Sequence, residues 1–66
     1  MIKCNLSRMM GERKMKISDL VTETGINRGT ITRLYHETYS RVDVEVIDQL
    51  CDFFDCSVCE LLERVD

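Results

Sequence analysis

Polar side chains that can contact nucleic acid lie close together between residues 28 and 33. They are Arg28, Thr30, Thr32 and Arg33. Arginine can donate two parallel hydrogen bonds to guanine O6 and N7, and threonine can contact a phosphate or a thymine methyl group. Ile31 and Leu34 recur at helical spacing, so these polar residues fall away from an apolar stripe. A short helix with an apolar back and such a face suits insertion into a DNA major groove.

The residues before this helix predict a second helix and a tight turn that joins the two. Apolar residues at helical spacing indicate a preceding helix over about residues 17–24. Gly25 can adopt the positive φ that ends a helix, and Asn27 is a strong N-cap for the next one. Ile26 is apolar although it lies in the turn, which favours a turn pressed into a core. Two short helices joined by a tight turn that contains glycine indicate a helix-turn-helix.

This segment resembles the helix-turn-helix of the phage repressor and Cro family, also called XRE-type regulators. The matching residues are Leu20, Gly25, Ile31 and Leu34. With the helices on either side, the resemblance covers nearly the whole chain. Val21 stands where the family usually has alanine, and Ile17 where many members have a phosphate-binding glutamine. The resemblance implies an all-α, lambda-repressor-like domain of five short helices over residues 1–66. It also implies a sequence-specific DNA-binding transcriptional regulator, with a repressor as the favoured role.

The resemblance further implies which residues contact DNA. The base-reading positions fall on Arg28, Gly29, Thr32 and Arg33. The backbone positions fall on Lys16, Ser18, Asn27, Thr30, His36, Tyr39 and Arg41. Gly29 has no side chain to read with, so we expect it to allow close approach of the helix. A local helix cap is an equal alternative for Ser18, and an ordinary solvated surface is the alternative for His36 and the two arginines.

Charge is divided unevenly along the chain. Residues 1–41 hold eight basic and four acidic side chains, whereas residues 42–66 hold one basic and eight acidic ones, so the halves carry +4 and −7. A basic half that contains the helix-turn-helix is consistent with a surface facing DNA, and the acidic half would then point away. The alternative is that both halves are ordinary solvated surface.

Further helices are predicted on both sides of the motif. Apolar spacing indicates a helix over about residues 6–14 capped by Asn5, and another over about residues 44–55 capped by Asp43. Ser57 and Glu60 form a capping-box sequence that opens a fifth helix. The apolar residues expected in that helix are Leu61, Leu62 and Val65. Residues 2–4 are expected to form an extended arm, and no other strand is predicted.

Four cysteines, Cys4, Cys51, Cys56 and Cys59, raise the question of a metal site. Cys56 and Cys59 have the spacing of half a structural zinc site, but they form the only such pair. Cys51 and Cys59 fall at apolar-periodic positions, and free cysteine often behaves as a small buried hydrophobe. Core packing is therefore the favoured interpretation, with zinc binding and redox use as alternatives. No metal, cofactor or small-molecule ligand is expected.

Length bounds the remaining functions. The 66 residues suffice for one small domain, and they leave little room for an enclosed active site, so an enzyme is not expected. No apolar run approaches the ~20 residues of a membrane span, and the N-terminus does not resemble a signal peptide, so a cytoplasmic protein is expected.

The expected partners are a double-stranded DNA operator and a second copy of the chain, because two modules read two half-sites. Residues that could form the dimer contact are Ile2, Phe53, Val58, Leu62 and Val65. The alternative function is a protein-interaction module, such as an antitoxin or adaptor, in which the acidic half binds a partner.

Overall fold

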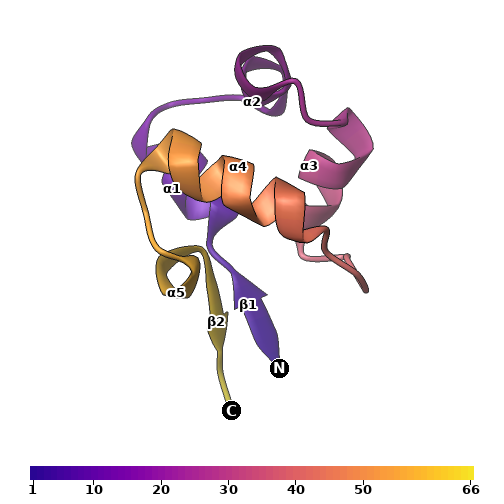
Figure 1. The fold of residues 1–66 in the computed structure, drawn as a ribbon, viewed down its shortest axis with the longest axis vertical. Helices are drawn as coiled ribbons and strands as arrows, with labels where there is room; N and C mark the ends of the chain where they lie inside the picture. Colours follow the sequence, from indigo (N-terminus) through magenta and orange to yellow (C-terminus); the bar gives the residue numbers. More distant parts are fainter.

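The computed structural model covers residues 1–66 and contains five short helices with a small sheet at one end (Figure 1). The helices are α1 (Leu6–Glu12), α2 (Ile17–Thr24), α3 (Arg28–His36), α4 (Val44–Phe54) and α5 (Val58–Leu61). The strands are β1 (Ile2–Cys4) and β2 (Leu62–Arg64). None of the helices has the length and apolar character that crossing a membrane requires.

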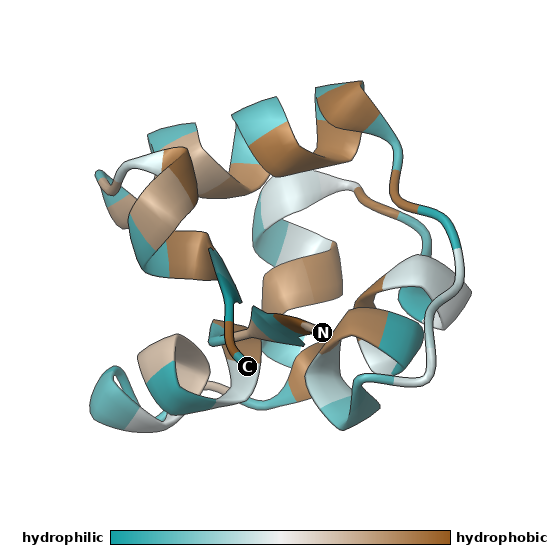
Figure 2. Ribbon diagram, turned by 90° about the horizontal axis from the view of Figure 1, so that it is seen from below, coloured by the Kyte–Doolittle hydropathy of each residue, from teal (hydrophilic) through white to brown (hydrophobic).

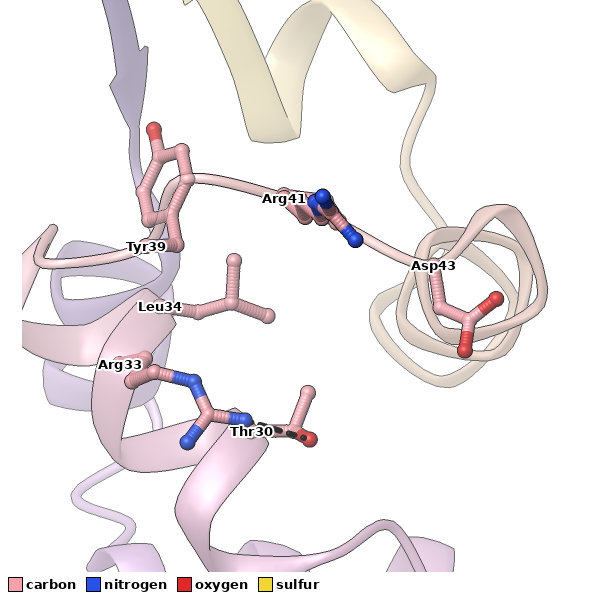
Figure 3. Close-up of a pocket in the computed structure, with 7 residues that line it drawn as sticks. Thr30, Arg33, Leu34, Tyr39, Arg41 and Asp43 are labelled. Atoms are coloured by element: carbon pink, nitrogen blue, oxygen red, sulfur yellow. Dashed lines mark hydrogen bonds between the residues drawn. The ribbon is translucent and has the colours of Figure 1, made fainter.

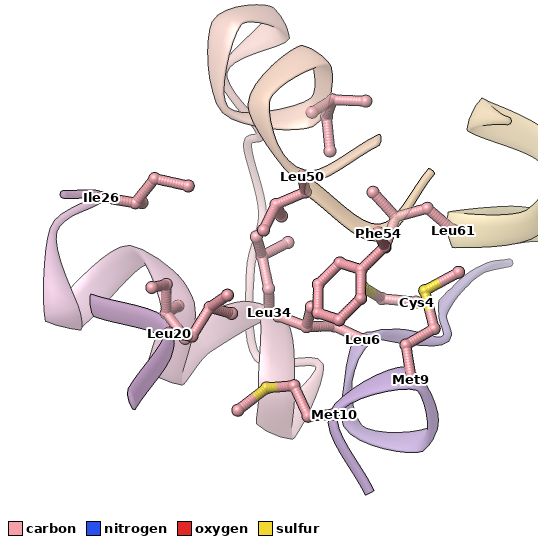
Figure 4. Close-up of a cluster of buried hydrophobic side chains, with 12 residues drawn as sticks. Cys4, Leu6, Met9, Met10, Leu20, Ile26, Leu34, Leu50, Phe54 and Leu61 are labelled. Atoms are coloured by element: carbon pink, nitrogen blue, oxygen red, sulfur yellow. The ribbon is translucent and has the colours of Figure 1, made fainter. Parts of the chain in front are cut away.

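One apolar core holds the helices together. Its twelve buried side chains are Cys4, Leu6, Met9, Met10, Leu20, Ile26, Ile31, Leu34, Ile47, Leu50, Phe54 and Leu61. Every helix contributes at least one of them (Figure 4). Colouring by hydropathy shows the apolar residues mostly on the sides of the helices that face one another (Figure 2). The predicted apolar stripes therefore meet in a single cluster.

The sheet corrects the expected all-α class, because the fold is helix-rich but not entirely helical. The fifth helix ends at Leu61, and Leu62 turns into extended backbone with φ −122° and ψ 129°. β2 then pairs antiparallel with β1, with Ile2 opposite Arg64 and Cys4 opposite Leu62. The predicted extended segment at residues 2–4 is confirmed, whereas the placement of Leu62 and Val65 in a helix is wrong.

Two predicted caps are also corrected. The Asn5 side chain makes no capping bond to α1; its amide nitrogen instead donates to the Glu60 carbonyl (3.0 Å) and to Glu63 Oε1 (3.1 Å). Asn5 thereby ties the start of α1 to the segment where α5 becomes β2. Asp43 precedes α4 with extended backbone, but its side chain makes no capping bond.

The first four helices each end in a turn that contains one residue at positive φ. Gly25, with φ +74°, ends α2 as predicted, and its N–H donates to the Val21 carbonyl at 2.8 Å. The turns after α1, α3 and α4 instead place Lys14, Glu37 and Asp55 at positive φ. The first helix is consequently shorter than predicted and ends at Glu12.

Arg13, a basic residue of the N-terminal half, contacts the C-terminal end of α4. Its Nη2 donates to the Phe54 carbonyl at 3.2 Å, and its guanidinium lies over the Phe54 ring at 4.9 Å. A cation near the last carbonyls of α4 favours the negative end of the helix dipole. Arg13 therefore fastens α1 to α4.

Candidate nucleic-acid interface

The turn between α2 and α3 fixes the start of α3 by several short hydrogen bonds. Asn27 Oδ1 accepts from the N–H groups of Gly29 (2.8 Å) and Thr30 (3.3 Å), which confirms the predicted N-cap. Ile26 is buried, and its N–H donates to Thr24 Oγ1 at 3.2 Å. The turn is thus packed against the core, as its apolar residue indicates.

The buried side of α3 is formed by Ile31 and Leu34, so the opposite side faces solvent. Arg28 and Arg33 are both exposed on α3. Arg33 Nη2 lies 3.5 Å from Thr30 Oγ1, so its guanidinium folds back toward the first turn of the helix. The two cations are therefore available to an anionic ligand.

Gly29 leaves room for this arrangement. A Cβ atom at Gly29 would lie 3.0 Å from Asn27 Oδ1 and 3.3 Å from Arg33 Nη1. Any larger residue would press on the capping oxygen and on the guanidinium together. A side chain at residue 29 would therefore require Asn27 Oδ1 or the Arg33 guanidinium to shift slightly, a constraint for which the sequence offers no separate signal.

An open hollow lies beside the N-terminal end of α2. It is lined by Met15, Lys16, Ile17, Ser18, Arg28 and Tyr35. It brings together two predicted backbone-contacting residues, Lys16 and Ser18, with the predicted base-reading Arg28. The Lys16 N–H donates to Asp19 Oδ2 at 2.8 Å, so a carboxylate and not the Ser18 hydroxyl caps the start of α2.

A second hollow lies on the other side of α3, between that helix and the loop before α4 (Figure 3). It is lined by Thr30, Arg33, Leu34, Tyr39, Arg41, Val42 and Asp43. Four predicted DNA-contacting residues, Thr30, Arg33, Tyr39 and Arg41, thus share one concave surface. The two arginines give it the chemistry of a phosphate-binding surface.

Tyr39 is partly committed to the fold. Its hydroxyl donates to the Ile2 carbonyl at 3.1 Å, and in Figure 3 it points away from Arg33 and Thr30. Burial raises the pKa of Tyr39, and Cys4 and Glu37 raise it further, so the phenol stays a protonated donor at neutral pH. A DNA contact by Tyr39 would have to use its ring or backbone, or break this bond.

Four predicted residues, Gly29 among them, lie outside both hollows. Asn27 caps α3, the Thr32 hydroxyl donates to the Arg28 carbonyl at 2.8 Å, and His36 is exposed near the end of α3. Two polar lining residues, Tyr35 and Asp43, are not among the predicted site residues. Tyr35 lies seven residues after Arg28, a helical spacing that could have placed both on one face.

The cysteines are distributed over the fold. Cys4 is buried, and burial raises the pKa of its thiol, so it serves as a core residue. Cys51 and Cys56 are half-buried against the core. Cys59 is exposed, so its predicted core placement is wrong; α5 has four residues, and only Leu61 is buried. No three histidine, cysteine or acidic side chains converge into a metal-binding group.

Helix α2, the tight turn at Gly25 and the capped, arginine-bearing α3 together define a helix-turn-helix, the motif of a class of DNA-binding domains. The family model for the Cro/C1-type helix-turn-helix DNA-binding domain matches residues 5–66, and the chain belongs to this family. A search of curated proteins finds no match for the chain. The predicted family is thereby confirmed, whereas the roles of individual residues in DNA contact stay predictions.

Proposed function

We propose that this chain, as a single domain over residues 1–66, is a sequence-specific transcriptional repressor that reads a DNA operator with the N-terminal part of α3. The observation that carries the proposal is the exposed pair Arg28 and Arg33 on the solvent side of α3, flanked by two hollows. Arg28, Gly29, Thr32 and Arg33 are the proposed base-reading positions. The backbone contacts come from Lys16, Ser18, Asn27, Thr30, His36, Tyr39 and Arg41.

The proposed mechanism separates affinity from specificity. Cations beside the two hollows neutralise phosphates and set the register of the domain on the duplex. Bidentate bonds from Arg28 or Arg33 to guanine then discriminate among sequences, each by about 1–3 kcal/mol. By occupying an operator the protein excludes other proteins from it, and the proposal assigns no catalytic role. A cytoplasmic location is part of the proposal.

A homodimer is also proposed, because one module of this size offers a small interface with DNA. Of the residues expected at the dimer contact, Ile2 and Val58 are 51% and 55% exposed. Phe53, Leu62 and Val65 are half-buried. Sedimentation velocity with and without operator DNA tests the assembly; a sharp 1:1 complex at saturation would contradict it.

Fluorescence anisotropy with duplex DNA at two salt concentrations tests the DNA-binding proposal. We expect affinity to fall steeply with salt, and Arg28→Ala/Arg33→Ala to weaken binding about tenfold or more. Arg64→Ala is the matched control, because Arg64 is an exposed arginine on β2, away from α3. Equal losses in the double variant and the control would reject the assignment of α3.

The alternative proposal is a protein-interaction module in the same family. The observation that favours it is the row of exposed acidic side chains on α4, Asp48, Asp52 and the following Asp55. If folded wild-type protein fails to bind any duplex at low salt, a partner search with wild-type and Asp52→Asn/Asp55→Asn protein decides whether this acidic face binds a protein.

A further inference from the structure

The C-terminal end of α4 closes with a six-residue hydrogen-bonded turn. The Cys56 N–H donates to the Cys51 carbonyl at 3.0 Å, and the Asp55 N–H donates to the Asp52 carbonyl at 3.3 Å. Asp55 has φ +51°, the left-handed conformation that such a turn requires. In this motif, called a Schellman motif, the side chains of the first and sixth residues commonly contact each other.

Here the first and sixth residues are both cysteines. Both side chains are half-buried, so they lie neither in the deep core nor fully in solvent. Burial, followed by the charge and hydrogen bonding of the neighbouring Cys51, raises the pKa of Cys56 to about 11. This influence of Cys51 is consistent with the proximity that the backbone turn imposes on the two residues.

We propose that Cys51 and Cys56 are a reversible disulfide site that closes the C-terminal turn of α4. The 3.0 Å bond from the Cys56 N–H to the Cys51 carbonyl folds the two residues back against each other, and a disulfide requires Cα atoms roughly 4.4–6.8 Å apart. The other cysteines are placed less favourably. Cys4 is buried in β1, and Cys59 is exposed on α5.

The oxidant is a small-molecule disulfide. The thiolate of one cysteine attacks a sulfur atom of that disulfide, its S–S bond breaks, and one small thiol leaves. The sulfur of the second cysteine then attacks the mixed disulfide, which forms the protein S–S bond and releases the second small thiol. Two protein thiols are oxidised and one small disulfide is reduced to two thiols, so electrons and protons balance.

Two consequences follow from the position of the site. Because Cys56 is a thiol at neutral pH, reaction through its thiolate accelerates as pH rises toward about 11. The site joins α4 to the segment before α5 and includes none of the residues that line the two hollows beside α3. Oxidation is therefore expected to raise the thermal midpoint while DNA affinity changes by less than about twofold.

The test incubates folded, reduced protein with oxidised glutathione and then blocks the remaining thiols with an alkylating reagent in denaturant, so that the buried Cys4 also reacts. Mass spectrometry then maps the product. We expect the loss of two hydrogen atoms, a peptide cross-link from Cys51 to Cys56, and two alkylated thiols at Cys4 and Cys59. Cys59→Ser is the matched variant that still forms the bond. Cys51→Ser and Cys56→Ser, each confirmed as folded by circular dichroism, do not.

Oxidation of urea-unfolded protein provides a second control. Without the Schellman turn, the shorter Cys56–Cys59 pair competes on equal terms, so the native preference for Cys51–Cys56 disappears. Three results for the native protein would overturn the proposal. They are a product that is chiefly the Cys56–Cys59 bond, a product with only mixed disulfides with glutathione, and no disulfide at a glutathione ratio that oxidises a reference dithiol.

Discussion

Asn27 connects local helix formation with the proposed interface. Its side-chain oxygen accepts from the N–H groups of the second and third residues of α3, and the residue itself is exposed at the end of the helix that would enter the groove. The cap and the proposed DNA contact would be different functions of one side chain. They can be separated because aspartate is as good an N-cap as asparagine, yet it carries a negative charge.

Two substitutions of Asn27 test this separation. Asn27→Ala removes the cap and is expected to lower the free energy of unfolding by about 1 kcal/mol. Asn27→Asp keeps the cap, gains from the helix dipole, and should be as stable as wild type or slightly more so. The same charge repels phosphates, so DNA affinity should fall about tenfold or more. Urea unfolding and anisotropy measure the two effects; unchanged affinity in Asn27→Asp would remove residue 27 from the backbone contacts.

Helix ends show what the sequence could and could not predict. The end of α2 was predictable because Gly25 marks it, and the start of α5 because Ser57 and Glu60 mark it. The other ends were less clear, since Lys14, Glu37 and Asp55 adopt positive φ without a glycine signal. The end of α5 was wrongly predicted because pairing with β1, some sixty residues earlier in the chain, ends it. Local patterns do not report such distant contacts.

The contrast between Gly25 and Lys14 gives a paired prediction. Gly25→Ala forces an alanine to φ +74°, and no atom lies within 4 Å of the added Cβ, so the expected loss of about 1–2 kcal/mol is purely conformational. Lys14 is a non-glycine residue at φ +55°, so Lys14→Gly removes the conformational cost and should stabilise the folded protein by up to about 1 kcal/mol. Urea midpoints check both values. Changes of the same sign would contradict this account of the helix ends.

The capping box of α5 predicts a pH dependence. The Ser57 N–H donates to Glu60 Oε1 at 3.0 Å, and the bonds to Ser57 hold the pKa of Glu60 below its ordinary value of 4.5. A lowered folded-state pKa means that this stabilisation is present above about pH 4.5 and is lost as pH falls through the folded pKa. Glu60→Gln keeps an oxygen acceptor without the titration. The stability advantage of wild type over Glu60→Gln should therefore shrink below about pH 4, and a pH-independent difference would refute the assignment.

At the scale of the whole molecule, the sheet links the chain ends to the proposed interface. Seen along the chain, β1 and β2 come from the first and last residues, and both termini lie at the same end of the molecule (Figure 1). The loop that follows α3 makes hydrogen bonds with the backbone of β1. The Cys4 N–H donates to Glu37 Oε1 at 3.0 Å, and Tyr39 donates to the Ile2 carbonyl. The loop beside Arg41 is therefore positioned by a strand that the sequence shows only as an extended arm.

Removing one of these bonds tests whether the strand and the loop act together. Glu37→Ala leaves the N–H of buried Cys4 without an acceptor, which is expected to destabilise the protein by about 1–3 kcal/mol. Glu37→Gln retains an oxygen acceptor and should lose less. Amide hydrogen exchange at Cys4 should accelerate in Glu37→Ala far more than exchange at Leu20, which lies in α2 away from the sheet.

The Tyr39→Phe variant extends this test, because the tyrosine hydroxyl bonds the Ile2 carbonyl and not the Cys4 N–H. If Tyr39→Phe also accelerates hydrogen exchange at Cys4, the two loop bonds hold β1 cooperatively. Equal acceleration at Cys4 and Leu20 in Glu37→Ala would instead mean that Glu37 contributes only to global stability. The loop would then be free to adjust to DNA independently of the sheet.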